Sequence, residues 1–430
     1  MSTIPWETDE LTPRMLRCNR CGFCQDVCPT YAATRSEMDV ARGRIRTLKM
    51  IHDGELDPVA DKAVLEQADQ CLLCGACTDN CPSSVPTHQL MQQARERILS
   101  TRGFSLFHTL VYRGLLGPQE RLERLTRMGT LLERGFNAKG QRRKWAQTAV
   151  ARALPMVHRG LTYLPDPLDR PARTRSRVKE RQNRPGRVVY FLGCGTNVFT
   201  PGAALASIQA LETLGLEVTV PRFSCCGGPH LAAGDTPRAQ KLARRNLMQL
   251  QELNPEFIVT DCATCAHTLA DYAEFFPVGH PLQDVIAALA PRVRDLNTFL
   301  RDRVCALEPA PDPNPVPPVK VTYHDPCHAL RGMKVRQAPR DIIRALPGVE
   351  LVEMEGADSC CGGAGSYAFR HPEMSQKILD RKVEAIAATG AHVLATSCPS
   401  CTLQLGAGLR RAGLSIPVLN PMELICATSL

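Results

Sequence analysis

The chain has 430 residues, of which 44% are hydrophobic, and a net charge of +9. This length allows two or three domains with real cores, and the composition excludes a disordered chain. The sequence shows no basic-then-apolar leader and no run of about 18 uninterrupted apolar residues. We therefore expect a cytoplasmic protein, with peripheral contact at the inner face of the cytoplasmic membrane as an open alternative. Its 20 cysteines then point to metal binding or catalysis, because structural disulfides are rare in reducing compartments.

Cysteine content and charge divide the chain into four parts. Residues 1–101 hold eight cysteines, residues 102–187 hold none, and residues 188–310 and 320–430 hold the other twelve. Residues 102–187 carry 20 Lys and Arg against 6 Asp and Glu, so we expect a basic, largely helical linker with a solvated face. Docking of an acidic partner or an anionic membrane surface is the alternative, and we expect no nucleic-acid partner. The proline-rich stretch at 309–320 predicts an extended connection between the last two parts.

The first part contains two copies of one cysteine run. Residues 18–28 read CNRCGFCQDVC before Pro29, and residues 71–81 read CLLCGACTDNC before Pro82. Both are the bacterial ferredoxin pattern for a 4Fe-4S cluster, in which the fourth cysteine commonly reaches the other cluster. The expected sets are Cys18, Cys21, Cys24 and Cys81 on the first cluster, and Cys71, Cys74, Cys77 and Cys28 on the second. A pair of zinc knots is the alternative.

Helical spacing surrounds these two runs. Apolar residues from Val40 to Ile51 recur at helical intervals, and residues 60–68 and 88–99 also read as helices. The segment resembles the mostly helical ferredoxin domain of iron–sulfur subunits in respiratory enzymes.

The third and fourth parts repeat each other. RVVYFLGC, FSCCGG and FIVTDCATC are followed about 135 residues later by KVTYHDPC, DSCCGG and HVLATSCPSC. In the first copy we expect strands at 188–192, 217–220 and 257–260 and helices at 203–214 and 237–253, which indicates parallel βαβ units. Every cysteine group follows a strand, so all five cysteines of a copy should meet at one sheet edge. These sets are Cys194, Cys225, Cys226, Cys262 and Cys265, and Cys327, Cys360, Cys361, Cys398 and Cys401.

The twin-cysteine pattern resembles the cysteine-rich CCG domain of the heterodisulfide reductase catalytic subunit. That resemblance implies a noncubane 4Fe-4S cluster in each copy, so that one or two clusters are expected beyond the ferredoxin pair; zinc or inert thiols are the alternative. The implied fold class is α+β multidomain, with a helical ferredoxin-like domain followed by two repeated α/β, Rossmann-like CCG domains. Glycines after the twin cysteines should let the backbone pass close to a cluster.

A few chemistry-bearing residues lie outside these sets. His324 and His328 flank Cys327 and could tune a cluster or pass protons, although a solvated or hydrogen-bonded histidine is the plainer interpretation. Cys305 and Cys426 stand in apolar surroundings and should be packed thiols. GCGTNV at 193–198 lacks the third glycine of the dinucleotide fingerprint, so we expect no flavin or NAD on this chain.

Two ferredoxin motifs followed by two CCG copies resemble the glycolate oxidase iron–sulfur subunit family. The stretches DVARGRIRTLK and CCGGAGSYAFRHPEM carry the same likeness. The resemblance implies an oxidoreductase subunit with an acceptor other than NAD, which takes electrons from an FAD-binding dehydrogenase of glycolate or D-lactate and passes them to a quinone or other acceptor. Both five-cysteine sets are complete here, whereas members of this family can lack some of one set. Completeness favours a heterodisulfide-reductase-like subunit as the alternative, and the anaerobic glycerol-3-phosphate dehydrogenase iron–sulfur subunit has the same parts.

Overall fold

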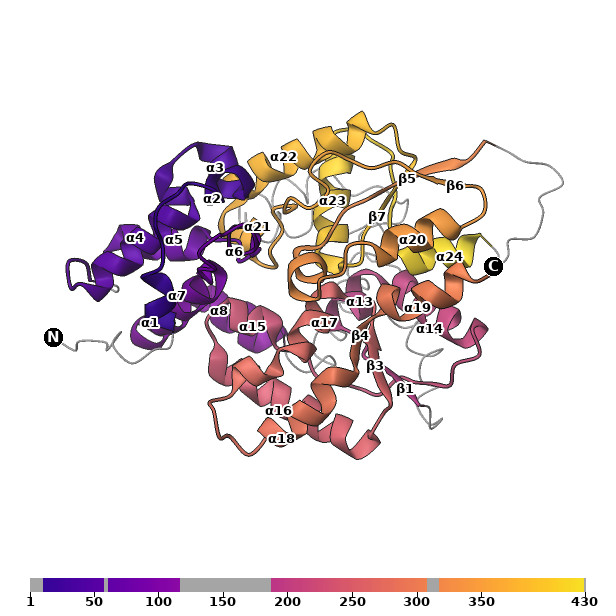
Figure 1. Ribbon diagram of the computed structural model, residues 1–430, viewed down its shortest axis with the longest axis horizontal. Coiled ribbons are helices and arrows are strands. Elements are labelled where there is room, and N and C mark those ends of the chain that lie inside the picture. Colours follow the sequence, from indigo (N-terminus) through magenta and orange to yellow (C-terminus); the bar gives the residue numbers. More distant parts are fainter. Residues whose placement is uncertain (1–10, 58–60, 117–186, 308–316, 429–430) are drawn as a thin grey trace, which may run out of the picture.

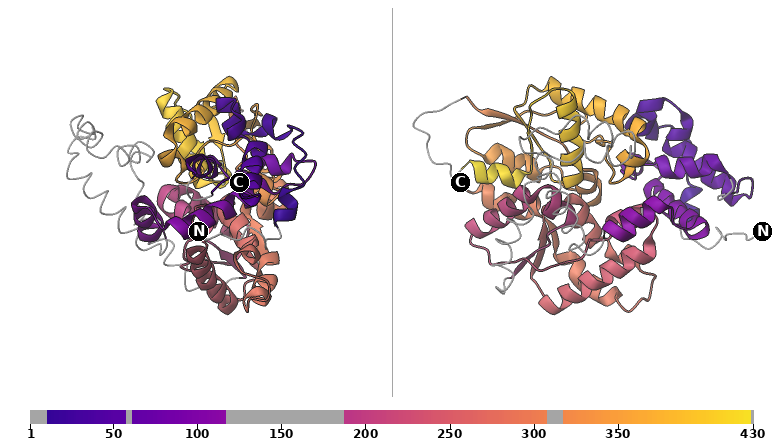
Figure 2. Two further views of the ribbon diagram at one scale, coloured as in Figure 1. Left: turned by 90° about the vertical axis from the view of Figure 1, so that its left-hand side faces the viewer. Right: turned by 180° about the vertical axis from the view of Figure 1, so that it is seen from behind.

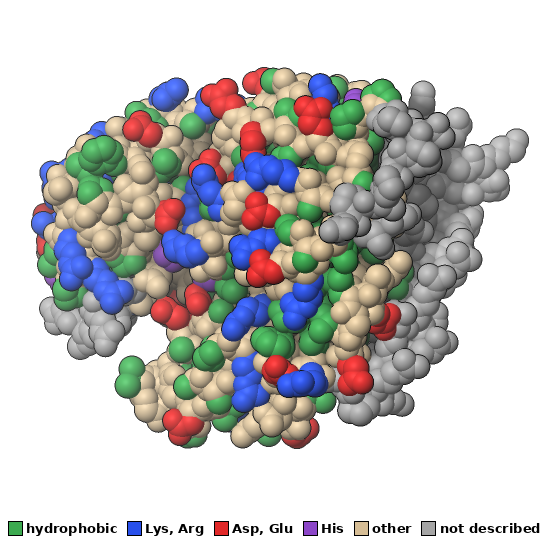
Figure 3. All heavy atoms as spheres, turned by 45° about the vertical axis from the view of Figure 1, so that its right-hand side comes forward, with side chains coloured by type: hydrophobic (Ala, Val, Ile, Leu, Met, Phe, Trp, Pro, Cys, Tyr) green, Lys and Arg blue, Asp and Glu red, His purple; other side chains and the backbone are tan. Residues whose placement is uncertain are grey.

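The computed structural model describes residues 11–57, 61–116, 187–307 and 317–428. The helical N-terminal part lies at one end of the molecule, beside two α/β units that stack on each other (Figure 1). The view from behind shows the same arrangement (Figure 2). Most of the basic linker and residues 309–316 of the proline-rich stretch fall outside the described residues. The described surface in Figure 3 mixes positive and negative side chains across its middle.

The N-terminal part is helical, as predicted. Its long helices pack Ile45, Leu48, Leu90 and Met91 into one core, and the predicted helices correspond to α4, α5 and α7. The elements are α1 (Leu11–Met15), α2 (Cys24–Val27), α3 (Pro29–Thr34), η1 (Glu37–Asp39), α4 (Ala41–His52), α5 (Lys62–Gln70), α6 (Ala76–Asp79), α7 (Thr87–Arg102), α8 (Leu106–His108) and η2 (Thr109–Leu115).

The first α/β unit is a four-stranded parallel sheet in the order β2-β1-β3-β4. Three strands were predicted, although β1 ends two residues earlier than expected, and the fourth was not. The strands are β1 (Val188–Tyr190), β2 (Val218–Thr219), β3 (Phe257–Thr260) and β4 (Val293–Asp295). The helices are α13 (Cys194–Phe199), α14 (Pro201–Thr213), α15 (Gly228–Ala232), α16 (Thr236–Leu253), α17 (Ala263–Ala270), η3 (Tyr272–Phe275), α18 (Gln283–Leu289), η4 (Ala290–Arg292) and α19 (Leu296–Cys305).

The second unit repeats this topology in the order β6-β5-β7-β8. Its strands are β5 (Val319–Tyr323), β6 (Val349–Leu351), β7 (Val393–Ala395) and β8 (Val418–Leu419). Its helices are η5 (His328–Gly332), α20 (Ala338–Ala345), α21 (Tyr367–Arg370), α22 (Pro372–Ala388), α23 (Pro399–Arg411) and α24 (Pro421–Ala427). The matching strand orders confirm the sequence repeat as a structural one.

The two α/β units share one hydrophobic core. Helix α24 of the second unit packs on α14 of the first, and α19 of the first packs on α20 of the second. Because α24 corresponds to α19 and α20 to α14, the contact is reciprocal. Ile208 and Leu300 of the first unit lie in the same buried cluster as Ile342 and Met422 of the second.

Both α/β units hold the helical part in place. Helix α3 packs on α22, and Asp69 forms an ion pair with Arg370 and a hydrogen bond with His371, whose Nε2 lies 2.7 Å from the Asp69 carboxylate. Arg95 donates from Nη1 to the Ala232 carbonyl oxygen of the first unit at 2.7 Å. The N-terminal part therefore touches the second unit across a gap of some three hundred residues in sequence.

The two leftover cysteines differ from each other. Cys426 packs beside the shared core, as predicted, and its Sγ donates to the Ala206 carbonyl oxygen at 3.6 Å. The prediction for Cys305 was wrong, because this thiol is exposed. Cys305 is the last residue of α19, and the neighbouring Val304 takes the position that faces the core.

Candidate metal centres

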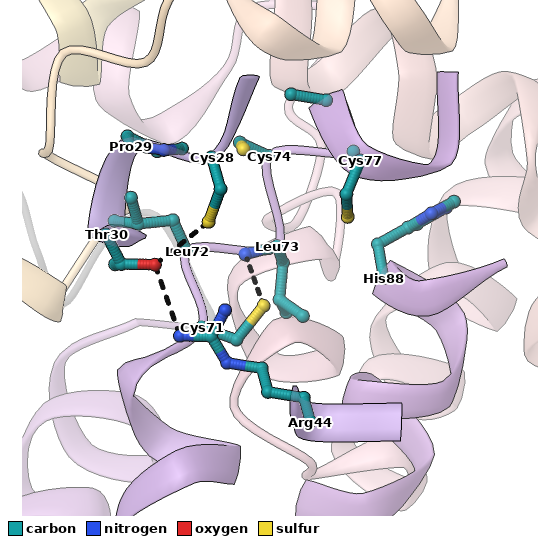
Figure 4. Close-up of a pocket in the computed structure, with 12 residues that line it drawn as sticks. Cys28, Pro29, Thr30, Arg44, Cys71, Leu72, Leu73, Cys74, Cys77 and His88 are labelled. Atoms are coloured by element: carbon teal, nitrogen blue, oxygen red, sulfur yellow. Dashed lines mark hydrogen bonds between the residues drawn. The ribbon is translucent and has the colours of Figure 1, made fainter. Parts of the chain in front are cut away.

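Four cysteines from both ferredoxin runs line one pocket of the helical part (Figure 4). They are Cys28, Cys71, Cys74 and Cys77, the set expected for the second cluster. Arg44 lies against them, 3% exposed; burial works to lower its pKa, but the Cys71 and Cys28 thiols outweigh this and raise it. Its Nη2 donates to Thr30 Oγ1 at 3.2 Å, and that hydroxyl lies 3.1 Å from Cys28 Sγ. A buried guanidinium beside four sulfurs suits an anionic group.

A second pocket lies nearer the surface. It is lined by Cys18, Cys21, Cys24 and Cys81, with Cys77 at its edge, which matches the set expected for the first cluster. Cys21 is exposed and the neighbouring Phe23 side chain is 55% exposed. The Val85 backbone N–H donates to Cys81 Sγ at 3.5 Å. This site therefore forms the outer end of the cysteine series.

The first α/β unit brings its five predicted cysteines together at the carboxyl ends of its strands. Cys194 Sγ lies 3.8 Å from Cys225 Sγ. Cys226 is hydrogen-bonded to both Cys225 and Cys265, and these two thiols lower the pKa of Cys226. Cys262 in turn contacts Cys265, so the five sulfurs form one continuous group.

The second unit likewise brings its five predicted cysteines together at the carboxyl ends of its strands. Cys361 Sγ lies 3.5 Å from Cys401 Sγ, and the Cys327 and Cys361 thiols lower the pKa of Cys360. Gly362 has φ +81°, and a Cβ at this residue would lie 2.8 Å from the Ser375 carbonyl oxygen of α22. The expected approach of the glycine backbone to a cluster stays a prediction. Its N–H donates to Cys360 Sγ at 3.5 Å.

The two five-cysteine sets touch. Cys262 and Cys401 each hydrogen-bond to Cys398 and lower its pKa, and the Ala263 N–H donates to the Ser397 carbonyl oxygen at 2.9 Å. Thr264 Oγ1 lies 3.8 Å from Cys398 Sγ. The turn after β3 thus meets the equivalent turn after β7.

The helical part joins this series at the second unit. Burial and the Cys360 thiol both raise the pKa of Cys74, and Leu72 packs against Cys360 and Tyr367 in one buried cluster. The order in space is therefore first ferredoxin set, second ferredoxin set, second α/β set, first α/β set. Chain order alone predicts the opposite sequence for the last two.

Three histidines from three parts of the chain approach the meeting point of the sets. His328 Nδ1 lies 3.0 Å from Thr264 Oγ1, and its ring lies 5.2 Å from the ring of His267. His267 faces Asp271 at 3.1 Å. Burial lowers the pKa of His88 and of His328 to about 4, and the nearby His267 contributes to both shifts, so both imidazoles are neutral near pH 7.

The donor chemistry fits iron–sulfur clusters at all four sets. The thiols lie close enough that burial and neighbouring thiols raise the pKa of several, including Cys77 to about 12 and Cys225 well above its ordinary value. The cationic iron–sulfur core of a cluster removes that penalty because it binds the cysteines as thiolates. Five thiols per α/β set exceed the four of one zinc ion.

Sequence reasoning missed several charged and polar neighbours of these sets. Arg44, Lys382, His88 and His267 carry no motif, and helical spacing alone assigns them to solvent. No local pattern distinguishes these residues from the solvent-exposed polar residues of a helix.

Comparison with known proteins agrees with this architecture. Residues 14–85 match the 4Fe-4S dicluster domain family, and residues 188–270 and 321–406 match the cysteine-rich CCG domain family. The chain is 31% identical over 423 residues to the "Probable glycolate oxidase iron-sulfur subunit" of Bacillus subtilis, covering 93% of this chain and 90% of that protein. The chain belongs to the glycolate oxidase iron–sulfur subunit family.

Two further relatives extend the comparison. The glycolate oxidase iron–sulfur subunit of Escherichia coli is 26% identical over 402 residues, 91% of this chain and 90% of that protein. One of the subunits of the fumarate reductase (CoM/CoB) of Methanothermobacter marburgensis is 33% identical over 247 residues, 57% of this chain and 47% of that protein.

Membership in the glycolate oxidase family makes the chain an iron–sulfur subunit of an oxidoreductase, with two 4Fe-4S clusters in its dicluster domain. Such a subunit works with partner catalytic subunits. Across the four described ranges, no helix has the length and apolar character needed to cross a bilayer.

Proposed function

We propose that the chain is the electron-transfer subunit of a flavin-dependent 2-hydroxy-acid dehydrogenase of the glycolate oxidase or D-lactate dehydrogenase type. An FAD-binding partner removes hydride from the substrate, and this chain passes the electrons on to a quinone or another acceptor. The chain itself binds neither flavin nor NAD. The proposal rests on one observation: the four cysteine sets adjoin in an unbroken series from the exposed Cys21 to Cys194.

The ligands follow from the two pockets and the two sulfur groups. Cys18, Cys21, Cys24 and Cys81 hold the first ferredoxin cluster, and Cys28, Cys71, Cys74 and Cys77 hold the second. Each α/β set of five holds one further iron–sulfur cluster. Bound clusters supply one-electron chemistry, while the protein supplies thiolates, buried cations such as Arg44, and backbone N–H donors that tune potential.

The test is anaerobic co-purification with the partner flavoprotein, followed by iron analysis and EPR. We expect about 16 iron atoms per chain, and signals that glycolate or D-lactate reduces only when the flavoprotein is present. A count of about eight iron atoms per chain would show that the α/β units hold no clusters. Reduction of the clusters by a 2-hydroxy acid without the flavoprotein would contradict the division of labour.

A disulfide reductase is the second candidate. Its support is that both five-cysteine sets are complete and meet at Cys262 and Cys398, with His328 nearby. Disulfide reduction by the isolated chain, abolished by Cys361→Ser with iron retained in the other sets, would establish this function and refute the pure relay.

A further inference from the structure

The two α/β units hold equivalent cysteine sets, but one equivalent position next to the sulfurs differs in chemistry. At a shift of 133 residues, Cys194 corresponds to Cys327 and Phe191 to His324. Both residues directly follow a strand, β1 or β5, and both are buried: Phe191 is 0% exposed and His324 is 1% exposed. The fold thus places an aromatic hydrocarbon beside one set and an imidazole beside the other.

Phe191 has an ordinary structural role. Its ring stacks on Phe223 with centroids 4.6 Å apart, and both rings belong to the buried cluster that includes Cys225 and Cys265. The first set therefore has an apolar wall on this side.

His324 lies beside the sulfurs of its own set. One of its ring nitrogens and the Sγ atoms of Cys361 and Cys401 all lie within 4.8 Å of one another. Among the described residues, no other group of three histidine, cysteine or carboxylate side chains has its ligand atoms this close together. The distances suit donors that converge on one metal ion.

The hydrogen bonds of His324 fix which nitrogen is free. The imidazole bonds to the Ala357 carbonyl oxygen, while Nδ1 is buried and has no hydrogen-bond partner in the described parts of the chain. Nε2–H is thus the donor, and Nδ1 keeps its lone pair. Metal-binding histidines show this pattern, with the second ring nitrogen donating to a carbonyl or carboxylate.

A buried nitrogen without a partner costs free energy unless something binds it. We propose that His324 Nδ1 is a ligand of the iron–sulfur centre in the second α/β unit, so that this centre has a mixed nitrogen and thiolate ligand set. The centre in the first unit then has thiolate ligands alone. This inference rests on the proposed presence of a cluster in each unit.

The test is pulsed EPR of the reduced full-length chain, prepared anaerobically with ¹⁵N-labelled histidine. We expect a ¹⁵N hyperfine coupling of the size given by a directly bound imidazole. The coupling should disappear in His324→Phe, which copies the residue of the first unit, and should persist in His328→Gln, which removes a second imidazole near the set.

Iron analysis of the same samples separates the two proposals. If the wild-type chain holds about 16 iron atoms but shows no histidine coupling, the proposal that His324 is a ligand is wrong, while the clusters in the α/β units stand. About eight iron atoms overturns both this ligand and the clusters in the α/β units. If His324→Phe loses iron, the comparison of wild type with His328→Gln decides: persistence of the coupling supports His324, and its loss contradicts it.

Discussion

Lys382 is a buried cationic neighbour of the second cysteine set. The side chain is 3% exposed, and its Nζ donates to the Ala357 carbonyl oxygen at 3.2 Å. Burial lowers the pKa of Lys382 to about 8, although the Cys361 and Cys360 thiols oppose this. Beside the first set lies Asp261, 1% exposed, and burial raises its pKa to about 7. A cation favours the reduced form of a cluster, so we expect the second centre to have the higher potential.

Lys382→Met tests this electrostatic asymmetry. Loss of a charge interaction worth about 1.4 kcal/mol corresponds to about 59 mV for a one-electron couple, so the midpoint potential of the second centre should fall by roughly that amount. EPR-monitored redox titration measures the shift. The control is Lys377→Met on the exposed side of the same helix, which should leave the potential unchanged; equal shifts in both variants would contradict the role of Lys382.

Gly362 is the residue of the twin-cysteine turn with the least room for a side chain. Gly362→Ala combines a positive φ with a Cβ clash against the Ser375 carbonyl oxygen, so we expect a loss of at least about 2 kcal/mol in unfolding free energy. Gly365→Ala is the matched control, because Gly365 has φ +64° but open space around it, and should cost only about 1 kcal/mol. Thermal unfolding checks the difference, and equal losses would show that the close approach is unimportant.

At the residue scale, the sequence predicts the cysteines well and their charged neighbours poorly. Spacing identifies all 18 cysteines of the four sets because each stands at a fixed distance from a turn or strand end. Lys382 and Arg44 lie in helices, and a long polar side chain there is normally assigned to water. Their burial depends on tertiary contacts that no local pattern contains.

The segment of α8 and η2 connects the helical part to the first α/β unit through one buried carboxylate. Asp235 has a side chain that is 0% exposed. Its carboxylate lies 3.2 Å from His108 Nε2 and 3.0 Å from Arg113 Nε. Burial alone would raise the pKa of Asp235, but these two partners hold it well below its usual range.

Asp235→Asn should therefore destabilise the protein by about 3 kcal/mol, at the low end for a buried pair because the Arg113 side chain is 41% exposed. The pKa of Asp235 is lower in the folded protein than the value of about 3.9 in the unfolded chain. The ionised carboxylate therefore stabilises the fold fully above about pH 3.9, and this stabilisation is lost as the pH falls through the folded pKa. Denaturant unfolding of both proteins from pH 7 to pH 3 measures this.

Asp302→Asn is the control, since Asp302 pairs with Arg301 but has an 81% exposed side chain. Its effect should stay within about 0.5 kcal/mol. A wild-type advantage over Asp235→Asn that grows as the pH falls below 4 would contradict the assigned sign.

At the element scale, the spacing of apolar residues predicts the long, regular helices and strands. Helices α4, α14 and α16 and strand β3 appear where the pattern places them. Strands β4 and β8, of three and two residues, were not predicted. They become strands by pairing with β3 and β7, which is a tertiary effect.

The two α/β units share one buried core, so we expect them to unfold together. Met422 of the second unit is 0% exposed, within a cluster that includes Ile208 and Leu300 of the first unit. The sequence predicts two domains, since each repeat has its own pattern. The shared core was not predictable, because the apolar faces of α14 and α24 do not identify the surface against which each helix packs.

Met422→Ala should lower the unfolding free energy by about 2–5 kcal/mol and should weaken both units together. Hydrogen exchange followed by mass spectrometry is the measurement: protection of β1 and of β5 should fall by a similar factor. Met248→Ala, at a side chain that is 54% exposed, should change neither. Loss of protection confined to the second unit would contradict a common core.

The contact between Cys74 and Cys360 also has a consequence for biosynthesis. Cys360 follows Cys74 by 286 residues (360 − 74), and ribosomes add about 5–20 residues per second. The inner ferredoxin site is therefore uncovered on the side of the second unit for about 15–60 s while the rest of the chain is made. Iron–sulfur assembly factors have access to this site during translation, and the last repeat to be synthesised closes it.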